Sequence, residues 1–131
     1  MMITTRGIHH ITITVANVQK SKKFYSEVCG MKTLVDEPAF VGLTDGDFSL
    51  WLSAARDPQP KGAPYHRNNI GLDHWAFKVA SIEELERIQQ HLKSLNISME
   101  DGGITDDDFG GRGIFTQDPD GMKVEFHLLT A

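Results

Sequence analysis

The sequence predicts an α+β fold built from two consecutive βαβββ modules, and three observations lead to this prediction. The pattern His-x-x-x-x-Val-Ala begins at His10 and occurs again 64 residues later, beginning at His74. Both copies alternate apolar and polar residues as a strand does, and residues at helical spacing follow each copy. A stretch rich in proline and glycine, about residues 55–72, separates the two copies. Repeats of this size cannot bury a sheet alone, so we expect the two modules to pair.

The first module, about residues 6–54, is predicted to contain a strand, a helix and two short strands. These elements are expected at residues 8–15, 18–28, 40–43 and 48–53. Gly30 stands where the helix should end, because glycine readily adopts the left-handed conformation that closes helices. Asp45-Gly46-Asp47 is typical of a tight turn between two strands.

The second module, about residues 73–130, repeats this order. Its predicted elements are a strand, a helix, a strand and the two strands of a closing hairpin, at residues 74–79, 81–95, 97–100, 113–117 and 122–129. Ser81 and Glu84 form the capping pattern that opens the helix. A loop rich in glycine and aspartate is expected at 101–113, and Asp118-Pro119-Asp120-Gly121 suits the turn of the hairpin.

The composition is that of a single globular domain over residues 1–131, with 40% hydrophobic and 24% charged residues. The net charge of -5 and the lack of a basic cluster argue against nucleic acid as a partner, since phosphate contacts need grouped Lys and Arg. The sequence has no apolar run of about 18 residues that could cross a membrane. Its start lacks the apolar core of a secretion signal, so we expect a cytoplasmic protein whose partner is a small molecule.

Side chains alternate between the two faces of a strand, and the helix of each module must cover the apolar face. The polar faces of three strands then carry His10, Thr12 and Thr14, next His74, Ala76 and Lys78, and finally Lys123, Glu125 and His127. Two imidazoles and one carboxylate make a donor set that leaves coordination positions open for a substrate. The pattern predicts a divalent metal ion (Fe, Mn, Ni, Co or Zn) held by His10, His74 and Glu125.

The order and spacing of these motifs resemble the vicinal oxygen chelate superfamily, which includes glyoxalases, bleomycin-resistance and fosfomycin-resistance proteins and extradiol dioxygenases. The resemblance covers nearly the whole chain and depends on the segments 10–15, 21–25 with Gly30-Met31, 74–79 and 118–125. It implies a cupped mixed sheet around a metal ion whose ligands are His10, His74 and Glu125. It also implies a homodimer with shared sites, in which His10 of one chain meets His74 and Glu125 of the other.

One departure from the family concerns a fourth ligand. Glyoxalase I members use an acid at the end of the first module. An alignment of the turn glycines Gly46 and Gly121 puts Leu50 at that position, whereas strand alternation puts Trp51 on the polar face. Neither side chain can bind a metal, so we expect a centre with three protein ligands, which argues against ordinary glyoxalase I activity.

Four residues are candidates for substrate binding. Thr12 and Trp51 are similar to a Thr and a Trp that line the substrate site in the fosfomycin-resistance branch. Phe115 departs from that branch and from the extradiol dioxygenases, which both have a tyrosine there, and the loop 101–113 has no lysine. Lys78 is placed to meet an anionic group of a substrate, although a solvated lysine at the rim of the site fits equally well.

We therefore expect a metal-dependent enzyme that binds a small oxygenated metabolite by bidentate chelation and performs chemistry of lyase or isomerase type. Glu125 would act as a ligand, and His127 as a proton shuttle or as a partner that orients Glu125. Three alternatives remain: an Fe(II) extradiol-type dioxygenase, a fosfomycin-resistance-like transferase, and a metal-free protein that sequesters a ligand as bleomycin-binding relatives do.

Overall fold

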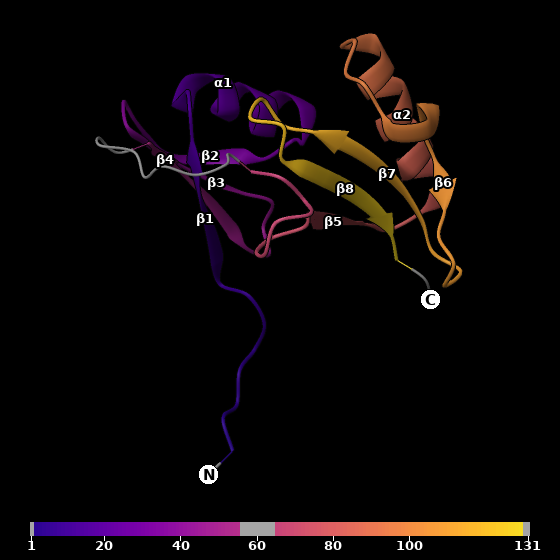
Figure 1. Cartoon of the computed structure of the whole chain (residues 1–131), viewed down its shortest axis with the longest axis horizontal. Coiled ribbons are helices and arrows are strands. Elements are labelled where there is room, and N and C mark those ends of the chain that lie inside the picture. The colour runs from indigo at the N-terminus through magenta and orange to yellow at the C-terminus, as the bar shows by residue number, and fades with distance from the viewer. Residues whose placement is uncertain (1, 56–64, 130–131) are drawn as a thin grey trace. The chain divides into compact units, whose positions relative to one another are not determined.

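The computed structural model describes residues 2–55 and 65–129, and the chain divides into two compact units, Met1–Pro60 and Lys61–Ala131. Each unit contains one four-stranded mixed sheet with its own helix (Figure 1). The turn-forming residues of the predicted connection, Pro58, Pro60, Gly62 and Pro64, lie outside the described residues. Among the residues described, no helix combines the length and the apolar character needed to span a bilayer.

The first unit opens with β1 (His10–Val15) and α1 (Val18–Lys23), which continues as the π-helix η1 (Phe24–Val28). Asn17 caps α1, because its side chain accepts a hydrogen bond from the backbone N–H of Lys20 at 3.0 Å. Three strands follow, β2 (Lys32–Glu37), β3 (Phe40–Thr44) and β4 (Ser49–Ala54). β1 pairs in parallel with β4, and the sheet continues through antiparallel β3 to β2.

The second unit has the same topology. Its elements are β5 (Trp75–Val79), α2 (Ile82–Ser94), the short 3-10 helix η2 (Glu100–Gly102), β6 (Thr105–Asp106), β7 (Arg112–Gln117) and β8 (Lys123–Leu128). β5 pairs in parallel with β8, and antiparallel β7 and β6 complete the order β5-β8-β7-β6. The repeated topology confirms the predicted α+β fold of two βαβββ modules.

The predicted strand at residues 97–100 is wrong. Asn96 and Asp101 both have left-handed backbone conformations, with φ of 56° and 53°, so they close off an extended strand at either end of this segment. The hydroxyl of Thr116 donates to the carbonyl of Ser98 at 2.7 Å and thereby attaches the segment to β7. The edge strand is instead β6, which lies within the segment predicted as a loop and pairs with β7 through two residues.

β2 completes the first module, although the sequence pattern assigned no residues to it. All of its residues are exposed except the half-buried Val35, so it lacks the alternation of burial that marks a strand. It forms an edge of the sheet, and its pairing with β3 is irregular between Thr33 and Val35. Lys22 of α1 pairs with Asp36 of β2 and holds the pKa of that carboxyl below its usual range.

One face of each sheet packs against the helix of its own unit and forms the core. The buried apolar residues of the first unit include Ile13, Val15, Phe24, Tyr25, Leu50 and Leu52, and those of the second include Trp75, Phe77, Leu85, Leu92, Val124 and Phe126. Burying one such side chain contributes about 1.5–3 kcal/mol, so these residues determine which face of each strand turns inward. The burial pattern confirms the predicted faces of β1 and β5. In β8, Val124 and Phe126 are buried as predicted, and Glu125 between them is buried as well.

Strand register decides which residue of β4 corresponds to Glu125. Trp51 lies opposite Thr12 in the parallel pair of β1 with β4, and Glu125 lies opposite Ala76 in the pair of β5 with β8. Thr12 and Ala76 each stand two residues after the repeated histidine, so Trp51 takes the place of Glu125. Leu50 is fully buried in the core. The interpretation from strand alternation is therefore confirmed, and the ungapped alignment that chose Leu50 is wrong.

Candidate metal centre

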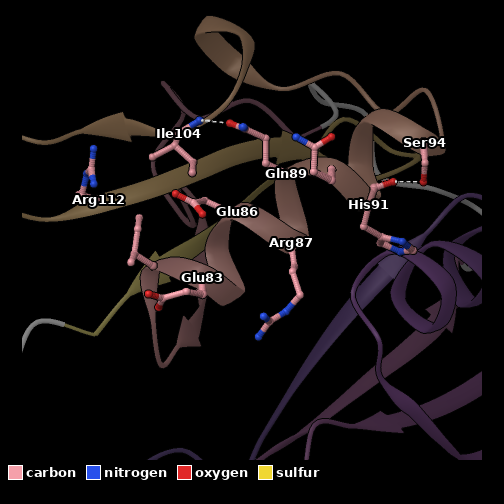
Figure 2. A pocket seen from close by; sticks show the side chains of 10 residues that line it. Glu83, Glu86, Arg87, Gln89, His91, Ser94, Ile104 and Arg112 are labelled. Atoms are coloured by element: carbon pink, nitrogen blue, oxygen red, sulfur yellow. Dashed lines mark hydrogen bonds between the residues drawn. The ribbon is translucent and has the colours of Figure 1, made fainter.

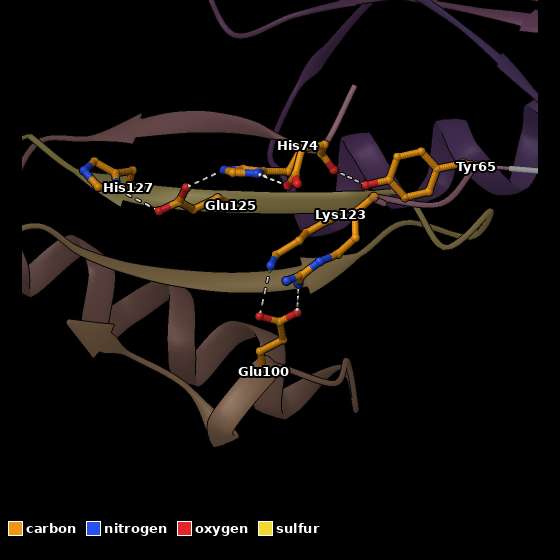
Figure 3. Close-up of polar contacts among 8 residues, drawn as sticks. Tyr65, His74, Glu100, Lys123, Glu125 and His127 are labelled. Atoms are coloured by element: carbon orange, nitrogen blue, oxygen red, sulfur yellow. Dashed lines mark hydrogen bonds and ion pairs between the residues drawn. The ribbon is translucent and has the colours of Figure 1, made fainter. Parts of the chain in front are cut away.

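Two predicted ligands meet on the open face of the second sheet, by which we mean the face opposite α2. His74 directly precedes β5, and Glu125 lies in β8, the strand parallel to β5 (Figure 3). Nε2 of His74 lies 3.2 Å from Oε1 of Glu125. The side chain of Glu125 is only 10% exposed, so its charge depends on partners within the protein.

A second carboxylate contacts the other nitrogen of the His74 ring. Oδ1 of Asp73 lies 2.7 Å from Nδ1 of His74. An ionised carboxylate can only accept a hydrogen bond, so Nδ1 carries the proton that Asp73 accepts. This contact, aided by the charges of Arg67 and Lys123, holds the pKa of Asp73 below its usual range.

The facing atoms of His74 and Glu125 suit a bound cation. With its proton on Nδ1, a neutral imidazole presents a lone pair on Nε2 to Oε1, which is also an acceptor. Either a proton on Nε2 or a metal ion between the two atoms makes this contact favourable. Nitrogen and oxygen ligands lie about 2.0–2.2 Å from ions such as zinc, so two ligands near a right angle are about 3 Å apart. The separation of 3.2 Å therefore fits two donors to one ion.

His127 holds the second oxygen of Glu125. Its Nδ1 lies 2.7 Å from Oε2 of Glu125, and its side chain is 37% exposed. Because Oε2 has this partner, Oε1 is the oxygen that remains for the position between Glu125 and His74. Orientation of Glu125 is a role that this contact allows, and both predicted roles of His127, orienting partner and proton shuttle, stay predictions.

Two glycines provide room for this pair of side chains. A Cβ at Gly113 would lie 2.6 Å from Oε2 of Glu125, and a Cβ at Gly111 would lie 2.8 Å from Cε1 of His127. The loop before β7 is closed by Asp107, whose carboxylate accepts two backbone N–H groups at 2.7 and 2.8 Å. These bonds hold the pKa of Asp107 below its usual range. The sequence pattern assigned Gly111 to a loop and Gly113 to the end of that loop, where a strand begins, because spacing does not show which side chain crosses over them.

Phe115 forms an apolar wall beside the facing atoms. It lies opposite Glu125 in the pairing of β7 with β8, and its ring meets that of His74 edge-on at 5.4 Å. Nζ of Lys123 lies 4.3 Å from the centre of the Phe115 ring and 3.3 Å from Glu100. A cation over an aromatic face is attractive, so Lys123 helps to hold this wall in place.

Asp73 and Lys123 are contributors that the sequence analysis did not single out. The available signal for Asp73 was its position next to His74. For Lys123, the signal was its place on the same strand face as Glu125, two residues away. Neither signal reveals a contact, because both depend on the direction of a long or rotatable side chain.

Lys78 lies near the edge of the open face, where it is exposed and stands opposite His127 in the strand pairing. It also lines a shallow hollow shared with residues of α2 such as Arg87. A second hollow beside α2, lined in part by Glu86, Arg87 and Arg112, contains none of the predicted site residues (Figure 2). The structure thus places Lys78 in solvent, and contact with a substrate stays a prediction.

The remaining candidates belong to the first unit. His10 and Thr12 are exposed on β1, and Thr12 lies opposite Trp51 in β4. The ring of Trp51 stacks on that of Phe40 with centroids 4.9 Å apart. Within residues 2–55 and 65–129, no group of three or more His, Cys, Asp or Glu side chains could hold a metal ion. The convergence of His10 with the pair in the second unit therefore stays a prediction.

The fold and the open face together define a class of protein: a duplicated βαβββ module in which a histidine before one strand meets a glutamate of the parallel strand. The sequence matches the Glyoxalase/Bleomycin resistance protein/Dioxygenase superfamily over residues 7–126. The chain belongs to this family, which confirms the resemblance described above.

The relatives carry several different names. Metallothiol transferase FosB of Lysinibacillus sphaericus is 29% identical over 130 residues, covering 98% of this chain and 86% of its own length. Glutathione transferase FosA of Serratia marcescens is 28% identical and covers 94% of this chain and 81% of its own length. The solved structure of a putative glyoxalase from Bacillus halodurans is 25% identical, with a TM-score of 0.77 and coverage of 93% and 95%. Because relatives with one fold carry different reaction names, the comparisons establish the family of this chain but not its reaction.

The glycine beneath Glu125 gives a test of the packing. In metal-free protein, we expect Gly113→Ala to lower the free energy of unfolding by roughly 1–3 kcal/mol, because the new Cβ would crowd Oε2 of Glu125. In a Glu125→Ala background, part of this loss should disappear, while the contact at 3.0 Å with the backbone carbonyl of Phe126 remains. Urea unfolding of the four proteins measures both effects. Additive effects of the two substitutions would contradict the packing described.

Proposed function

We propose that this protein is a divalent-metal-dependent enzyme that binds a small oxygenated molecule by chelation and promotes proton transfer in it, as a lyase or isomerase of glyoxalase type. The proposed ligands are His10, His74 and Glu125. The proposal depends on the 3.2 Å contact of His74 Nε2 with Glu125 Oε1. The other nitrogen of the His74 ring, Nδ1, and the other oxygen of Glu125, Oε2, already have partners. A divalent cation is a group that both facing donors can bind.

The chemistry is divided between the ion and the side chains around it. A divalent ion, when bound, supplies Lewis-acid polarisation of a substrate oxygen. Phe115, with Lys123 over its ring, excludes water from one side of the position between His74 and Glu125. His127 is part-exposed and hydrogen-bonded to Glu125, and histidine is the side chain best suited to accept and return protons near neutral pH.

Thiol transfer to a small electrophile is the second candidate function. It is supported by the names of the FosB and FosA relatives and by Trp51 and Thr12, which lie opposite each other on β4 and β1. Phe115 argues against it, because it lacks the hydroxyl that the fosfomycin-resistance branch has at this place. Both functions use the same proposed ligand set, so that set can be tested before the reaction is known.

We also propose that the protein is a homodimer with shared sites. The second unit offers His74 and Glu125 on its open face, while the repeated histidine of the first unit, His10, is exposed on β1. A third donor is needed to complete a metal site of the usual kind. His10 of the partner chain would provide it in each of the two sites.

Metal analysis tests the ligand set. We expect about one divalent ion per chain in the anaerobically purified protein, and loss of that ion in His74→Ala and Glu125→Gln, because each removes a donor. His91→Ala changes a histidine of α2 and is the matched control that should keep the ion. Elemental analysis gives the metal content of each protein. No uptake of added Fe, Mn, Ni, Co or Zn by the wild type would overturn the proposal and favour a metal-free ligand-binding protein.

Mixed dimers test the sharing of sites. A dimer of one His10→Ala chain and one Glu125→Gln chain, isolated with two affinity tags, should contain one intact site and one that lacks both donors. We therefore expect about half of the wild-type metal content, although each variant alone should bind none. A mixed dimer as empty as its parents would show that His10 acts within its own chain or does not bind metal.

Assays of the metal-loaded protein separate the candidate reactions. Isomerisation of a thiol–2-oxoaldehyde adduct would support proton-transfer chemistry, with His127 as the residue that moves the proton. Consumption of free thiol with an epoxide such as fosfomycin would instead support the transferase. Oxygen uptake with a catechol and ferrous iron would support the dioxygenase. His127→Ala should lower the rate of isomerisation by about 100-fold or more while leaving the metal content measurable.

A further inference from the structure

We propose that Asp73 is a positioning residue that fixes the orientation and the tautomer of the His74 ring, so that Nε2 faces Glu125 as a metal donor. This inference rests on the proposed function, because it gives a role to the neighbour of a proposed ligand. It starts from the contact of Oδ1 of Asp73 with Nδ1 of His74 at 2.7 Å. Asp73 is not itself one of the proposed ligands.

The His74 ring is held from three directions. Asp73 contacts Nδ1, Glu125 lies 3.2 Å from Nε2, and the ring of Phe115 meets the imidazole edge-on at an interplanar angle of 74°. A half-turn of the ring about its Cβ–Cγ bond would present carbon atoms to both carboxylates. Both carboxylates can accept a proton from the ring, but the contact with Asp73 at 2.7 Å is shorter than that with Glu125 at 3.2 Å, so we infer that a neutral ring carries its proton on Nδ1.

Asp73 is held in place at small electrostatic cost. The hydroxyl of Tyr65 donates to the backbone carbonyl of Asp73, which anchors the chain just before β5 (Figure 3). The side chain of Asp73 is 59% exposed, so its charge stays largely solvated. The carboxylate can therefore remain ionised beside the imidazole whether or not an ion is bound.

Two outer contacts thus leave two inner atoms free. Asp73 engages Nδ1 of His74, and His127 engages Oε2 of Glu125. The atoms without these contacts, Nε2 and Oε1, are the two that face each other. A carboxylate on the far nitrogen of a ligating histidine also raises the basicity of the near nitrogen, and losing such a partner typically weakens metal binding by about 10- to 100-fold.

Two measurements test this role. Long-range ¹H–¹⁵N NMR of histidine-labelled, metal-free protein, at a pH where the ring is neutral, reports which nitrogen of His74 carries the proton. Titration with Co²⁺ or Zn²⁺ gives the metal affinity. In the wild type, we expect the proton on Nδ1; in Asp73→Ala, we expect it to move largely to Nε2, with metal affinity about 10- to 100-fold weaker. Asp73→Asn keeps an acceptor oxygen without the charge, so it should retain the tautomer and lose less affinity.

Glu100→Gln is the matched control. It removes a negative charge from the cluster that contains Arg67 and Lys123, the same cations that act on Asp73, but it does not contact His74. We expect it to change neither the tautomer nor the metal affinity by more than about twofold. Loss of affinity in Glu100→Gln equal to that in Asp73→Ala would overturn the positioning role and indicate a general effect of charge.

The two proposals fail in different ways. A wild-type protein that takes up no metal contradicts the proposed function, while a tautomer shift in Asp73→Ala would still support the orientation of His74 by Asp73. A wild-type His74 with its proton on Nε2, or an Asp73→Ala protein that keeps both the tautomer and the metal affinity, overturns the role of Asp73. If Asp73→Ala does not fold, the tautomer of the wild type decides the question: a proton on Nδ1 of His74 supports the role of Asp73, and a proton on Nε2 overturns it.

Discussion

The parallel pairing of β5 with β8 is the constraint on which the candidate site depends. It brings His74, at the start of one strand, beside Glu125 in the other. The register of that pairing is fixed from the opposite face, where Val124 and Phe126 are buried. A shift of one residue would turn Glu125 into the core, and a buried carboxylate without a partner is strongly destabilising. The packing of the apolar face therefore determines the geometry of the polar one.

The sequence predicted the strands in which apolar and polar residues alternate. The prediction failed for strands without this alternation. Burial alternates along β1 and β5, and the same reasoning placed Trp51 correctly against an ungapped alignment. In β8 the buried run Val124 to Phe126 includes Glu125, so the alternation of residue types, not of burial, identified its faces. β2 and β6 lie at sheet edges, and exposed residues give no such pattern. The segment after α2 contains apolar residues, as a strand would, but its composition does not predict the left-handed backbone conformation of Asp101.

The candidate site was predictable to the level of strand faces and no further. Alternation put His74, Glu125 and His127 on one surface, and the structure places them in contact. The roles of Asp73 and Gly113 depend on how a side chain turns within its rotamers and crosses to the next strand, which spacing along the chain does not encode. The reaction is even harder to predict from the sequence, because relatives named as transferases and as glyoxalases share this fold.

The register position that holds Glu125 in the second unit holds Trp51 in the first. There the indole stacks on Phe40 and covers Gly42, where a Cβ would collide with it. The two halves of the duplicated chain therefore restrict substitution for different reasons: a side chain at position 42 would displace an aromatic stack, and one at position 113 would displace a carboxylate. Two copies of one topology thus tolerate different mutations, so each half has its own set of accessible sequences.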